Sequence, residues 1–275
     1  MAIPKAWSSF VDDAAIFPPG DAALHEATAA YGARRSDPHA GLVGSFVLRD
    51  TDLPLVRGFD APLSVVVTGG AGQIAGPAML CAKLGLDLAA LEIALRDPTD
   101  LPGNARRVVA AVDAARLDGG LRDDTPVYVE LPAPDPHGPW LAAADVVAAA
   151  GFRLKFRTGG LESHLFPSPG AVVRLIDVAL DRETPFKCTA GLHRAVRHTD
   201  PRTGFEHHGF LNILAATRAA FDGAASGDVI GLLESRDGAA LAETDVDGAR
   251  RWFLSFGSCS VEEPLADLRE LGLIA

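Results

Sequence analysis

Two lysines lie within short apolar segments that otherwise resemble buried strands, Lys155 in RLKFRTGG and Lys187 in PFKCTAGLH. The chain contains 21 Arg but only four Lys. A retained Lys is therefore a candidate for amine chemistry that the permanently protonated guanidinium cannot perform. A Lys amine attacks a carbonyl carbon only when it is neutral, and burial or a second cation lowers its pKa towards that state. The two lysines predict Schiff-base chemistry, with a structural Lys–Glu pair at a barrel mouth as the alternative.

Further polar residues lie close to both lysines at the expected strand ends. Glu130 ends the segment VYVE, Arg157 follows Lys155 by two positions, and Thr189 follows Lys187 in the same way. Residues two apart in a strand point to the same side, and neighbouring strands are ~4.8 Å apart, so these side chains can converge in one pocket. We expect both lysines to be catalytic and Glu130 to move protons. The substrate contacts expected here are Arg157, Thr158 and Thr189.

A turn of small residues follows the last apolar segment. Gly257-Ser258-Cys259-Ser260 precedes VEEPLADLREL, a predicted helix with Ser260 as its N-cap and Glu263 three residues later. Small residues at a helix N-terminus expose backbone N–H groups that suit an anion. We expect Ser258 and Ser260 to bind a phosphate or carboxylate of the substrate.

The polar segment RAVRHTDPRTGFEHHG and the residue before it carry four histidines, His193, His198, His207 and His208. Imidazole titrates near neutral pH, and we expect His193 and His208 to act in acid–base catalysis. Asn212 lies four residues beyond His208, on the same face of a helix that begins there, and is expected to bind substrate.

The histidine spacing does not match a known local metal motif. Neither HxH nor HExxH occurs, so we assign no metal ligand and expect no cofactor. The alternative that stays open is a divalent cation held by these histidines together with Glu130 or Asp12.

Eight short segments have the composition of buried strands: Val43–Leu48, Leu63–Thr68, Leu91–Leu95, Val127–Leu131, Arg153–Arg157, Pro185–Thr189, Val229–Leu233 and Phe253–Phe256. Helical stretches such as Ala105–Leu117, Trp140–Ala150 and Ala171–Leu180 lie between several of them. Continuous apolar strands that alternate with helices indicate a parallel sheet covered on both faces. Eight such units in 275 residues favour an α/β fold of the single (β/α)8 barrel, or TIM, type.

Two segments do not fit a minimal barrel. Residues 1–40, with VDDAAIFPPGD and a helix over Ala22–Arg35, are expected to form an N-terminal cap, in which Asp12 folds over the barrel mouth to bind substrate. Residues 194–228, after the sixth predicted strand, are expected to form a lid of a long loop and a helix that begins near Phe210. No repeat or low-complexity linker divides the chain, so residues 1–275 are predicted to form one domain.

Composition restricts the class of protein. The formal net charge of −11 and the pI of about 5.1 disfavour nucleic-acid binding, because no positive field attracts phosphate backbones. Three cysteines without a CxxC motif disfavour a disulfide scaffold and favour a reducing compartment. No signal-peptide pattern or ~20-residue apolar stretch occurs. We expect a cytoplasmic protein without membrane contact, with a small anionic molecule as partner and a homodimer as the assembly to consider.

The motifs resemble those of class I aldolase barrels, specifically the deoxyribose-phosphate aldolase family. That family carries Lys-x-x-Thr-Gly on one strand, Lys-x-x-Gly-Gly on the next and a final Gly-x-Ser phosphate turn. This chain has KFRTG from Lys155, KCTAG from Lys187 and GSCS from Gly257. The resemblance covers about residues 126–193 and 253–263. The family's acidic strand, Asp-x-Val-x-Asn, is matched poorly by Leu91–Arg96.

The resemblance implies a lyase with Lys155 as the Schiff-base lysine and Lys187 as the neighbour that lowers its pKa. It also implies phosphate contacts from Ser258 and Ser260. Three alternatives stay open. In the first, Lys155, Arg157 and Lys187 bind an anion without forming a covalent bond, as in a decarboxylase, isomerase or phosphoribosyltransferase-like enzyme. The histidines could serve a metal-dependent hydrolase or lyase, or the barrel could bind a metabolite without catalysis.

Overall fold

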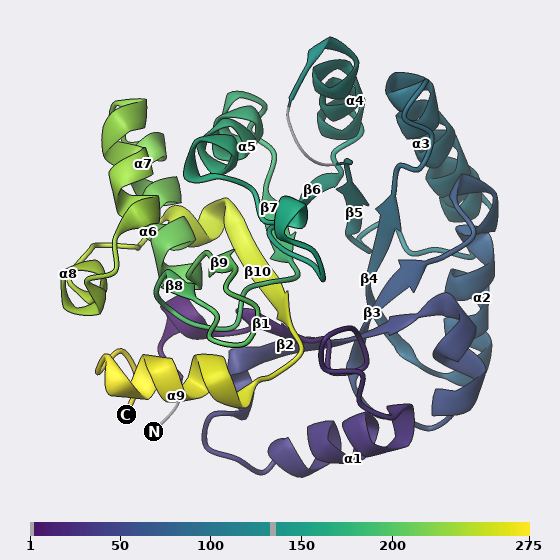
Figure 1. Ribbon diagram of the computed structural model, residues 1–275. Coiled ribbons are helices and arrows are strands. Elements are labelled where there is room, and N and C mark those ends of the chain that lie inside the picture. The colour runs from purple at the N-terminus through teal and green to yellow at the C-terminus, as the bar shows by residue number, and fades with distance from the viewer. Residues whose placement is uncertain (1–2, 133–135) are drawn as a thin grey trace.

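A closed barrel of parallel strands forms the centre of the molecule (Figure 1). The computed structural model describes residues 3–132 and 136–275, and in this part of the chain eight strands form the barrel. They are β1 (Val11–Asp13), β2 (Val43–Arg49), β3 (Pro62–Val67), β4 (Asp87–Ala94), β5 (Val127–Glu130), β6 (Arg153–Arg157), β7 (Phe186–Thr189) and β10 (Phe253–Ser258). Each strand pairs in parallel with its neighbour, and β1 closes the barrel against β10. All carboxyl ends therefore open at one end, where barrel active sites lie.

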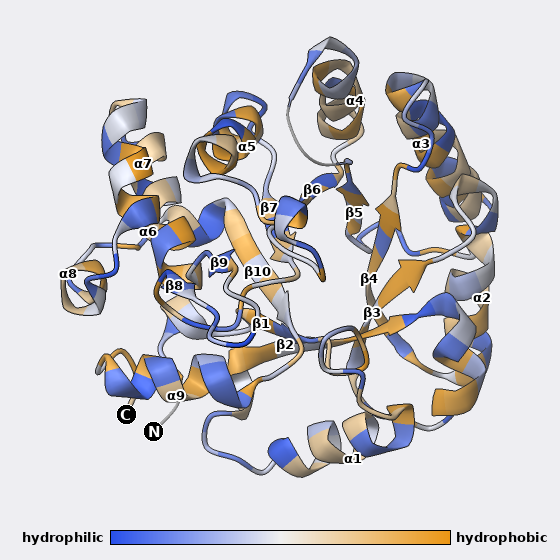
Figure 2. Cartoon of the chain, in the orientation of Figure 1, coloured by the Kyte–Doolittle hydropathy of each residue, from blue (hydrophilic) through white to orange (hydrophobic). Residues whose placement is uncertain are grey.

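Helices surround the barrel (Figure 1). They are α1 (Leu24–Arg34), α2 (Ala75–Leu84), α3 (Leu101–Leu117), α4 (Gly138–Ala149), α5 (Pro169–Asp181), α6 (Phe210–Phe221), α7 (Ser226–Glu234), α8 (Gly238–Ala242) and α9 (Glu262–Glu270). Short 3-10 turns are η1 (Lys5–Trp7), η2 (Ala40–Leu42), η3 (Asp50–Val56), η4 (Ala71–Gln73), η5 (Ser163–Leu165) and η6 (Ala249–Arg251). The strands are largely hydrophobic and the helices mix hydrophobic with hydrophilic residues, as Figure 2 shows. This pattern is that of helices packed with one face against a barrel.

Local sequence explains where these helices begin. In α5, Ser168 is the N-cap and its hydroxyl accepts a hydrogen bond from the Ala171 N–H, while Pro169 occupies the first turn, where its missing N–H has no cost. The buried face of α5 includes Val172, Leu175 and Ile176. The spacing of these residues by three and four places them on one stripe of the helix, which packs inward.

The predicted (β/α)8 barrel is confirmed, but two of the strand assignments need correction. Val229–Leu233, predicted as a strand, lies in α7. A short apolar run is compatible with a strand or a buried helix, and the wider pattern with Val229 and Leu233 buried follows the helical period. The strand that completes the barrel is β1, within the segment predicted as a cap. Two of its three residues are aspartates, so it lacks the apolar composition of the other strands.

These corrections shift the position of the long insertion. The segment Pro185–Thr189 becomes the seventh barrel strand, and the insertion after it begins with a two-stranded hairpin, β8 (His198–Thr199) and β9 (Glu206–His207). The predicted helix near Phe210 is α6. Residues 194–228 thus combine a hairpin near the barrel mouth with helices of the outer layer.

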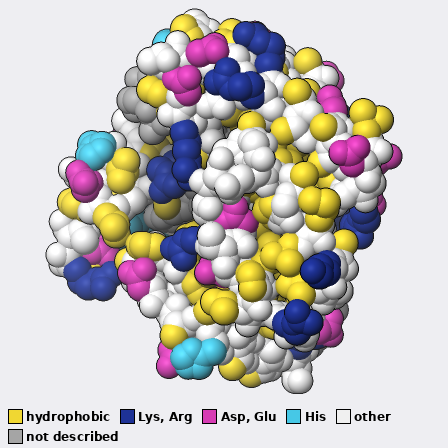
Figure 3. All heavy atoms as spheres, turned by 90° about the vertical axis from the view of Figure 1, so that its right-hand side faces the viewer, with side chains coloured by type: hydrophobic (Ala, Val, Ile, Leu, Met, Phe, Trp, Pro, Cys, Tyr) yellow, Lys and Arg dark blue, Asp and Glu magenta, His cyan; other side chains and the backbone are white. Residues whose placement is uncertain are grey.

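The outer face that carries α2 and α3 presents hydrophobic side chains interspersed with charged ones (Figure 3). Among the large apolar side chains, Met79 of α2 and Leu117 of α3 are exposed. In the described part of the chain, no helix has both the length and the apolar character that crossing a bilayer requires.

Candidate active site

Every strand of the barrel contributes a polar side chain to one buried network inside it. In chain order these residues are Asp12, Ser45, Ser64, Glu92, Tyr128, Lys155, Lys187 and Ser255, all buried. The serine hydroxyls donate to carboxylates: Ser45 to Asp12 at 2.6 Å, Ser255 to Asp12 at 2.7 Å and Ser64 to Glu92 at 2.5 Å. Burying so many polar groups is costly unless each is paired. Such a network inside a barrel is typical of a functional site.

Carboxylates and cations alternate through this network. The Lys187 ammonium lies 2.7 Å from Asp12 Oδ2 and 2.7 Å from Glu92 Oε1. The Lys155 ammonium lies 2.8 Å from Glu92 Oε2 and 2.9 Å from Glu130 Oε2. Arg157 continues the row, with its guanidinium 3.1 Å from Glu130 Oε1. The structure thus brings together five of the predicted site residues, and three carboxylates balance three cations.

The ion pairs decide the protonation of both lysines. Burial acts to lower the pKa of Lys155, but Glu92 and Glu130 outweigh it and raise that pKa above the ordinary value. The pKa of Lys187 is raised in the same way, because Asp12 and Glu92 outweigh its burial. The expectation that Lys187 lowers the pKa of Lys155 is therefore wrong for the free protein: Glu92 lies between the two ammonium groups and stabilises both charges.

The carboxylates are correspondingly ionised. Burial acts to raise the pKa of Glu92, but Lys155 and Lys187 outweigh it and hold that pKa well below its usual range. The pKa of Glu130 is also lowered, because Lys155 and Arg157 outweigh the effect of burial. Both carboxylates are therefore ionised within hydrogen-bond distance of Lys155 and hold its amine in the charged form.

A cavity of about 530 Å³ opens above this network at the carboxyl ends of the strands. Its floor includes Glu92, Lys155 and Lys187. Phe17, Pro18 and Pro19 line it from the N-terminal segment, Leu161, Leu165 and Phe166 from the loop after β6, and His207 from the hairpin. Asp12 does not line the cavity but lies beneath it against Lys187. The expectation that Asp12 folds over the mouth is therefore wrong; FPPG, a few residues further on, takes that position.

His193 lies at the rim of the cavity in a small polar cluster. Its Nδ1 is 3.2 Å from Glu263 Oε2 and 3.3 Å from Ser258 Oγ, and the Cys259 thiol is 3.8 Å from either ring nitrogen. Burial lowers the pKa of His193, although Glu263 opposes this effect. Burial raises the pKa of Cys259 to about 11, so the thiol stays protonated near neutral pH. The cluster places a neutral imidazole beside the cavity.

The serines of the predicted anion turn bond within the turn itself. The Ser258 hydroxyl donates to the Ser260 carbonyl at 2.6 Å and accepts from the Ser260 N–H at 3.3 Å. The Ser260 hydroxyl accepts from the Glu263 N–H at 3.3 Å, but α9 begins one residue later than predicted, with Val261 rather than Ser260 at its N-cap position. Glu262 and Glu263 place two carboxylates in the first turn of α9. Neither serine lines the cavity, although their neighbours Gly257 and Cys259 do.

Three other predicted site residues lie outside the cavity. His208 is fully buried, with Nε2 2.7 Å from the Pro167 carbonyl, and burial lowers its pKa to about 4. Asn212, also fully buried, accepts from the Arg197 N–H and donates to the carbonyls of Leu232 and Ser235. The Thr158 hydroxyl donates to the Ala190 carbonyl at 2.7 Å. Each of these contacts links one segment of the chain to another. Thr189, which was also predicted to contact the substrate, does line the cavity.

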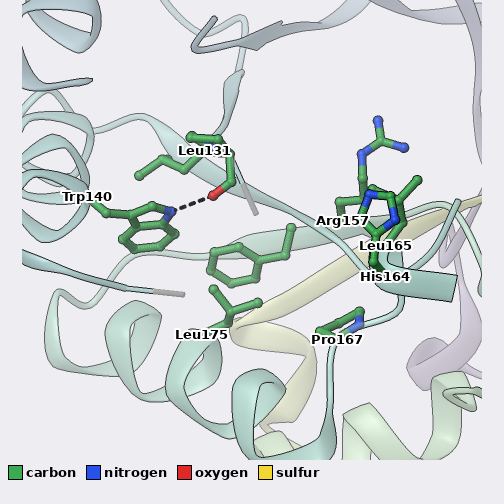
Figure 4. Close-up of a pocket in the computed structure, with 9 residues that line it drawn as sticks. Leu131, Trp140, Arg157, His164, Leu165, Pro167 and Leu175 are labelled. Atoms are coloured by element: carbon green, nitrogen blue, oxygen red, sulfur yellow. Dashed lines mark hydrogen bonds between the residues drawn. The ribbon is translucent and has the colours of Figure 1, made fainter. Parts of the chain in front are cut away.

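A second, much smaller crevice lies on the outer side of β6 (Figure 4). It measures about 20 Å³ and is lined by Trp140, Phe156 and Leu175 among others. The Trp140 indole N–H donates to the Pro132 carbonyl at 2.9 Å. In Figure 4 the Arg157 guanidinium points away from Trp140 and Leu175. Alternation along β6 thus directs Phe156 to the helices and its neighbours Lys155 and Arg157 to the barrel interior.

Sequence reasoning missed Glu92 and Arg96, and it also did not assign Ser45, Ser64, Tyr128 and Ser255 of the buried network to the site. Glu92 bridges both lysines, yet it lies in the segment Leu91–Leu95, which matched the aldolase pattern poorly. A carboxylate within an otherwise apolar strand was the signal that could have identified it. Arg96, just beyond β4, lines the cavity and is exposed. As for metals, the described residues contain no group of three or more His, Cys, Asp or Glu placed to hold an ion.

Comparison with known proteins supports the fold. No family model and no curated protein matches the sequence. Among solved structures, the chain is similar to a deoxyribose phosphate aldolase from Aeropyrum pernix, described as a tetramer, with a TM-score of 0.56 and 15% identity over 96% of this chain and 92% of that one. A protein from Toxoplasma gondii ME49, described under the same enzyme name, gives a TM-score of 0.55 and 14% identity over 98% and 95%. The expected aldolase-type barrel fold is thereby confirmed.

Proposed function

We propose that this protein is an aldolase-type lyase that forms an imine between Lys155 and a small carbonyl compound. The observation that carries the proposal is the position of Lys155 at the cavity floor, with Glu92 and Glu130 within 2.9 Å of its Nζ. Lys187 is more enclosed, between Asp12, Glu92 and the ring of Tyr128, whose centre is 5.1 Å from Nζ. Lys155 is therefore the better nucleophile, and Lys187 stabilises charge beside it.

The first steps would use only groups of this site. The Lys155 ammonium transfers a proton to Glu130, and the neutral amine attacks the carbonyl carbon. The resulting carbinolamine hydroxyl takes this proton back from Glu130 and leaves as water, which produces a protonated imine and restores the Glu130 carboxylate. This cation replaces the ammonium charge beside Glu92, so the charge balance of the network is retained.

The imine then supplies the electron sink for breaking a carbon–carbon bond. A base removes the proton of the substrate's β-hydroxyl group, the Cα–Cβ bond breaks, and its electron pair flows to the imine nitrogen to form an enamine and a free aldehyde. The enamine carbon takes up a proton, and water hydrolyses the imine to release the second product. Glu130 and the neutral imidazole of His193 are the groups at the cavity suited to these proton transfers.

One observation favours a second candidate. The pKa values of Lys155 and Lys187 are both raised, so both side chains are cations before substrate binds. Fixed cations in a water-restricted cavity stabilise developing negative charge without forming a covalent bond. The second candidate is therefore a non-covalent decarboxylase or isomerase in which the lysines act as an electrostatic clamp.

Reductive trapping separates the two candidates. The protein is incubated with a panel of small aldehydes, keto acids and sugar phosphates together with cyanoborohydride, and its intact mass is measured. A single reduced adduct supports imine chemistry, and its mass identifies the carbonyl compound. Binding of a panel member by calorimetry without any adduct would contradict the imine proposal and favour the electrostatic clamp.

A further inference from the structure

Among the described residues that line the cavity, one cation, Arg96, does not take part in the ion-pair network. Arg96 lines the cavity and is exposed, and within residues 3–132 and 136–275 its guanidinium forms no ion pair or side-chain hydrogen bond. The other cations of the cavity, Lys155, Lys187 and Arg157, all contact carboxylates at 3.1 Å or less. Arg96 is therefore positive charge that a ligand can neutralise.

The strand register places Arg96 above the lysines. Ala94 of β4 is in register with Glu130, which is in register with Lys155. Arg96 lies two residues beyond Ala94, just as Arg157 lies two beyond Lys155. Two residues advance a strand by ~6.6 Å towards the mouth and return the side chain to the same face. Arg157 is the last residue of β6, and Arg96 follows the end of β4 and also lines the cavity, so both lie at the next level towards the mouth, at strand ends separated only by β5.

The turn from which an anion site was expected is poorly suited to that role. Its Ser260 and Glu263 N–H groups already donate to serine hydroxyls, and Glu262 and Glu263 bring two negative charges to the helix N-terminus. Negative side chains at a helix N-terminus repel an anion that the backbone N–H groups would otherwise attract. The positive charge available to a substrate therefore lies on the opposite part of the barrel, over β4 to β6.

We propose that Arg96, assisted by Arg157, binds the anionic group of the substrate and so selects carbonyl compounds that carry a carboxylate or phosphate. The geometry suits a short molecule whose carbonyl reaches Lys155 while its anionic group stays one level higher. A planar guanidinium with several donors matches either anion. Glu162 is the remaining charged residue at the rim, and its Oε2 lies 3.4 Å from His164 Nδ1. This inference rests on the proposed function for the placement of the carbonyl.

The test compares two-carbon aldehydes that differ in charge. Half-saturating concentrations for reductive trapping are measured with glycolaldehyde, glyoxylate and glycolaldehyde phosphate, for the wild type and for Arg96→Ala. We expect Arg96→Ala to raise the half-saturating concentration of one or both anionic probes about 10- to 100-fold, the loss typical of a charge-assisted contact, and to leave that of neutral glycolaldehyde within about twofold. The stronger response identifies carboxylate or phosphate as the preferred group. Arg107→Ala is the matched control, because Arg107 pairs with Asp97 and Asp100 and does not line the cavity.

Two outcomes would overturn the inference. An equal loss for neutral and anionic probes would mean that Arg96 shapes the cavity rather than binding the anion, and no change for the anionic probes would mean that they bind elsewhere. If the wild type forms no adduct with any probe, the imine proposal fails while Arg96 is still testable. Calorimetry with glycolaldehyde phosphate then shows whether Arg96→Ala alone weakens binding, and unchanged affinity would again contradict the assignment.

Discussion

Lys155 and Lys187 lie in register on neighbouring strands, and each ammonium group contacts a different oxygen of Glu92, at 2.8 and 2.7 Å. Two lysines this close are expected to repel each other and to lower each other's pKa. The bridging carboxylate reverses this result and keeps both charged. In the free protein the charges of the ion pairs therefore cancel. The Lys155 amine becomes a nucleophile only when it transfers a proton to one of the neighbouring carboxylates.

Among the carboxylates of the network, Glu92 is the one whose replacement is expected to change the stability of the fold and the pKa of Lys155 most. Glu92→Gln leaves two buried ammonium groups without their shared counter-charge, which we expect to lower the free energy of unfolding by about 3–5 kcal/mol. The pKa of Lys155 should also fall. Urea denaturation measures the first effect and the pH dependence of trapping measures the second. Glu162→Gln, at the exposed rim, is the control that should change neither; an unchanged stability of Glu92→Gln would contradict the bridging role.

The raised pKa of Lys155 predicts an alkaline pH dependence for imine formation. Because only the neutral amine attacks, the trapping rate at sub-saturating carbonyl should rise continuously from about pH 6 to about pH 9, below the ordinary lysine pKa. Glu130→Gln removes one carboxylate and should shift this profile to lower pH. A wild-type rate that levels off near neutral pH would show that the lysine pKa is lowered in the free protein.

Acid should destabilise the fold through the same network. The pKa of Glu92 is lower in the folded protein than in the unfolded chain, so its contribution is fully present above pH ~4.3 and is lost as the pH falls towards the folded value. The lysine pKa values are raised, so their contributions persist below pH ~10.4 and disappear only in strong alkali. Unfolding free energies measured from pH 3 to pH 7 should decline below about pH 5. A flat profile there would contradict the ionised state of the network.

His208 and Asn212 are expected to stabilise the fold without taking part in chemistry. His208→Ala and Asn212→Ala each remove contacts that fasten buried segments, with an expected cost of about 1–3 kcal/mol. Because burial lowers the pKa of His208 to about 4, its contribution is present above the unfolded value of ~6.5 and is lost as the pH falls towards 4. Adduct formation per folded molecule should match the wild type. A lysine adduct lost in a fully folded Asn212→Ala protein would assign this residue to the site after all.

His193 is expected to separate imine formation from turnover. His193 lies at the cavity rim and its pKa is lowered. His193→Gln should therefore reduce the steady-state rate of cleavage about 100-fold, which is the usual rate contribution of a positioned acid–base group. The substrate is one that the trapping experiment has identified. The reduced adduct should form in normal amount, because Lys155 and its carboxylates are untouched. Turnover is followed by release of the aldehyde product, and equal losses of adduct and turnover would instead indicate a binding role.

The sequence was most informative where structure is locally determined. Strand alternation is a property of a few residues, so the inward directions of Lys155, Arg157 and Lys187 followed from the segments that contain them. The same reasoning placed Glu130 beside them, since consecutive parallel strands are neighbours in the barrel. The barrel fold itself followed from repeated apolar segments between helices.

The remaining features depend on contacts between distant parts of the chain. The strand β1 has three residues, and its Asp12 is acceptable inside the barrel only because Lys187, Ser45 and Ser255 are there to pair with it. The pKa of Lys155 depended on a carboxylate 63 positions away in the chain, Glu92, and reversed in direction once that partner was in place. The apolar run at Val229–Leu233 had no local feature that distinguished a strand from a buried helix.

The measurement that tests the central claim most directly is the location of the trapped adduct. The protein, Lys155→Arg and Lys187→Arg are each reduced with cyanoborohydride in the presence of a carbonyl compound that labels the wild type, and the labelled peptide is identified by mass spectrometry. Both variants keep a positive charge in the network, and circular dichroism verifies that they are folded. We predict an adduct on the peptide that contains Lys155, absent from Lys155→Arg and present in Lys187→Arg. An adduct that persists in folded Lys155→Arg, or that maps to Lys187, would contradict the assignment of Lys155 as the nucleophile.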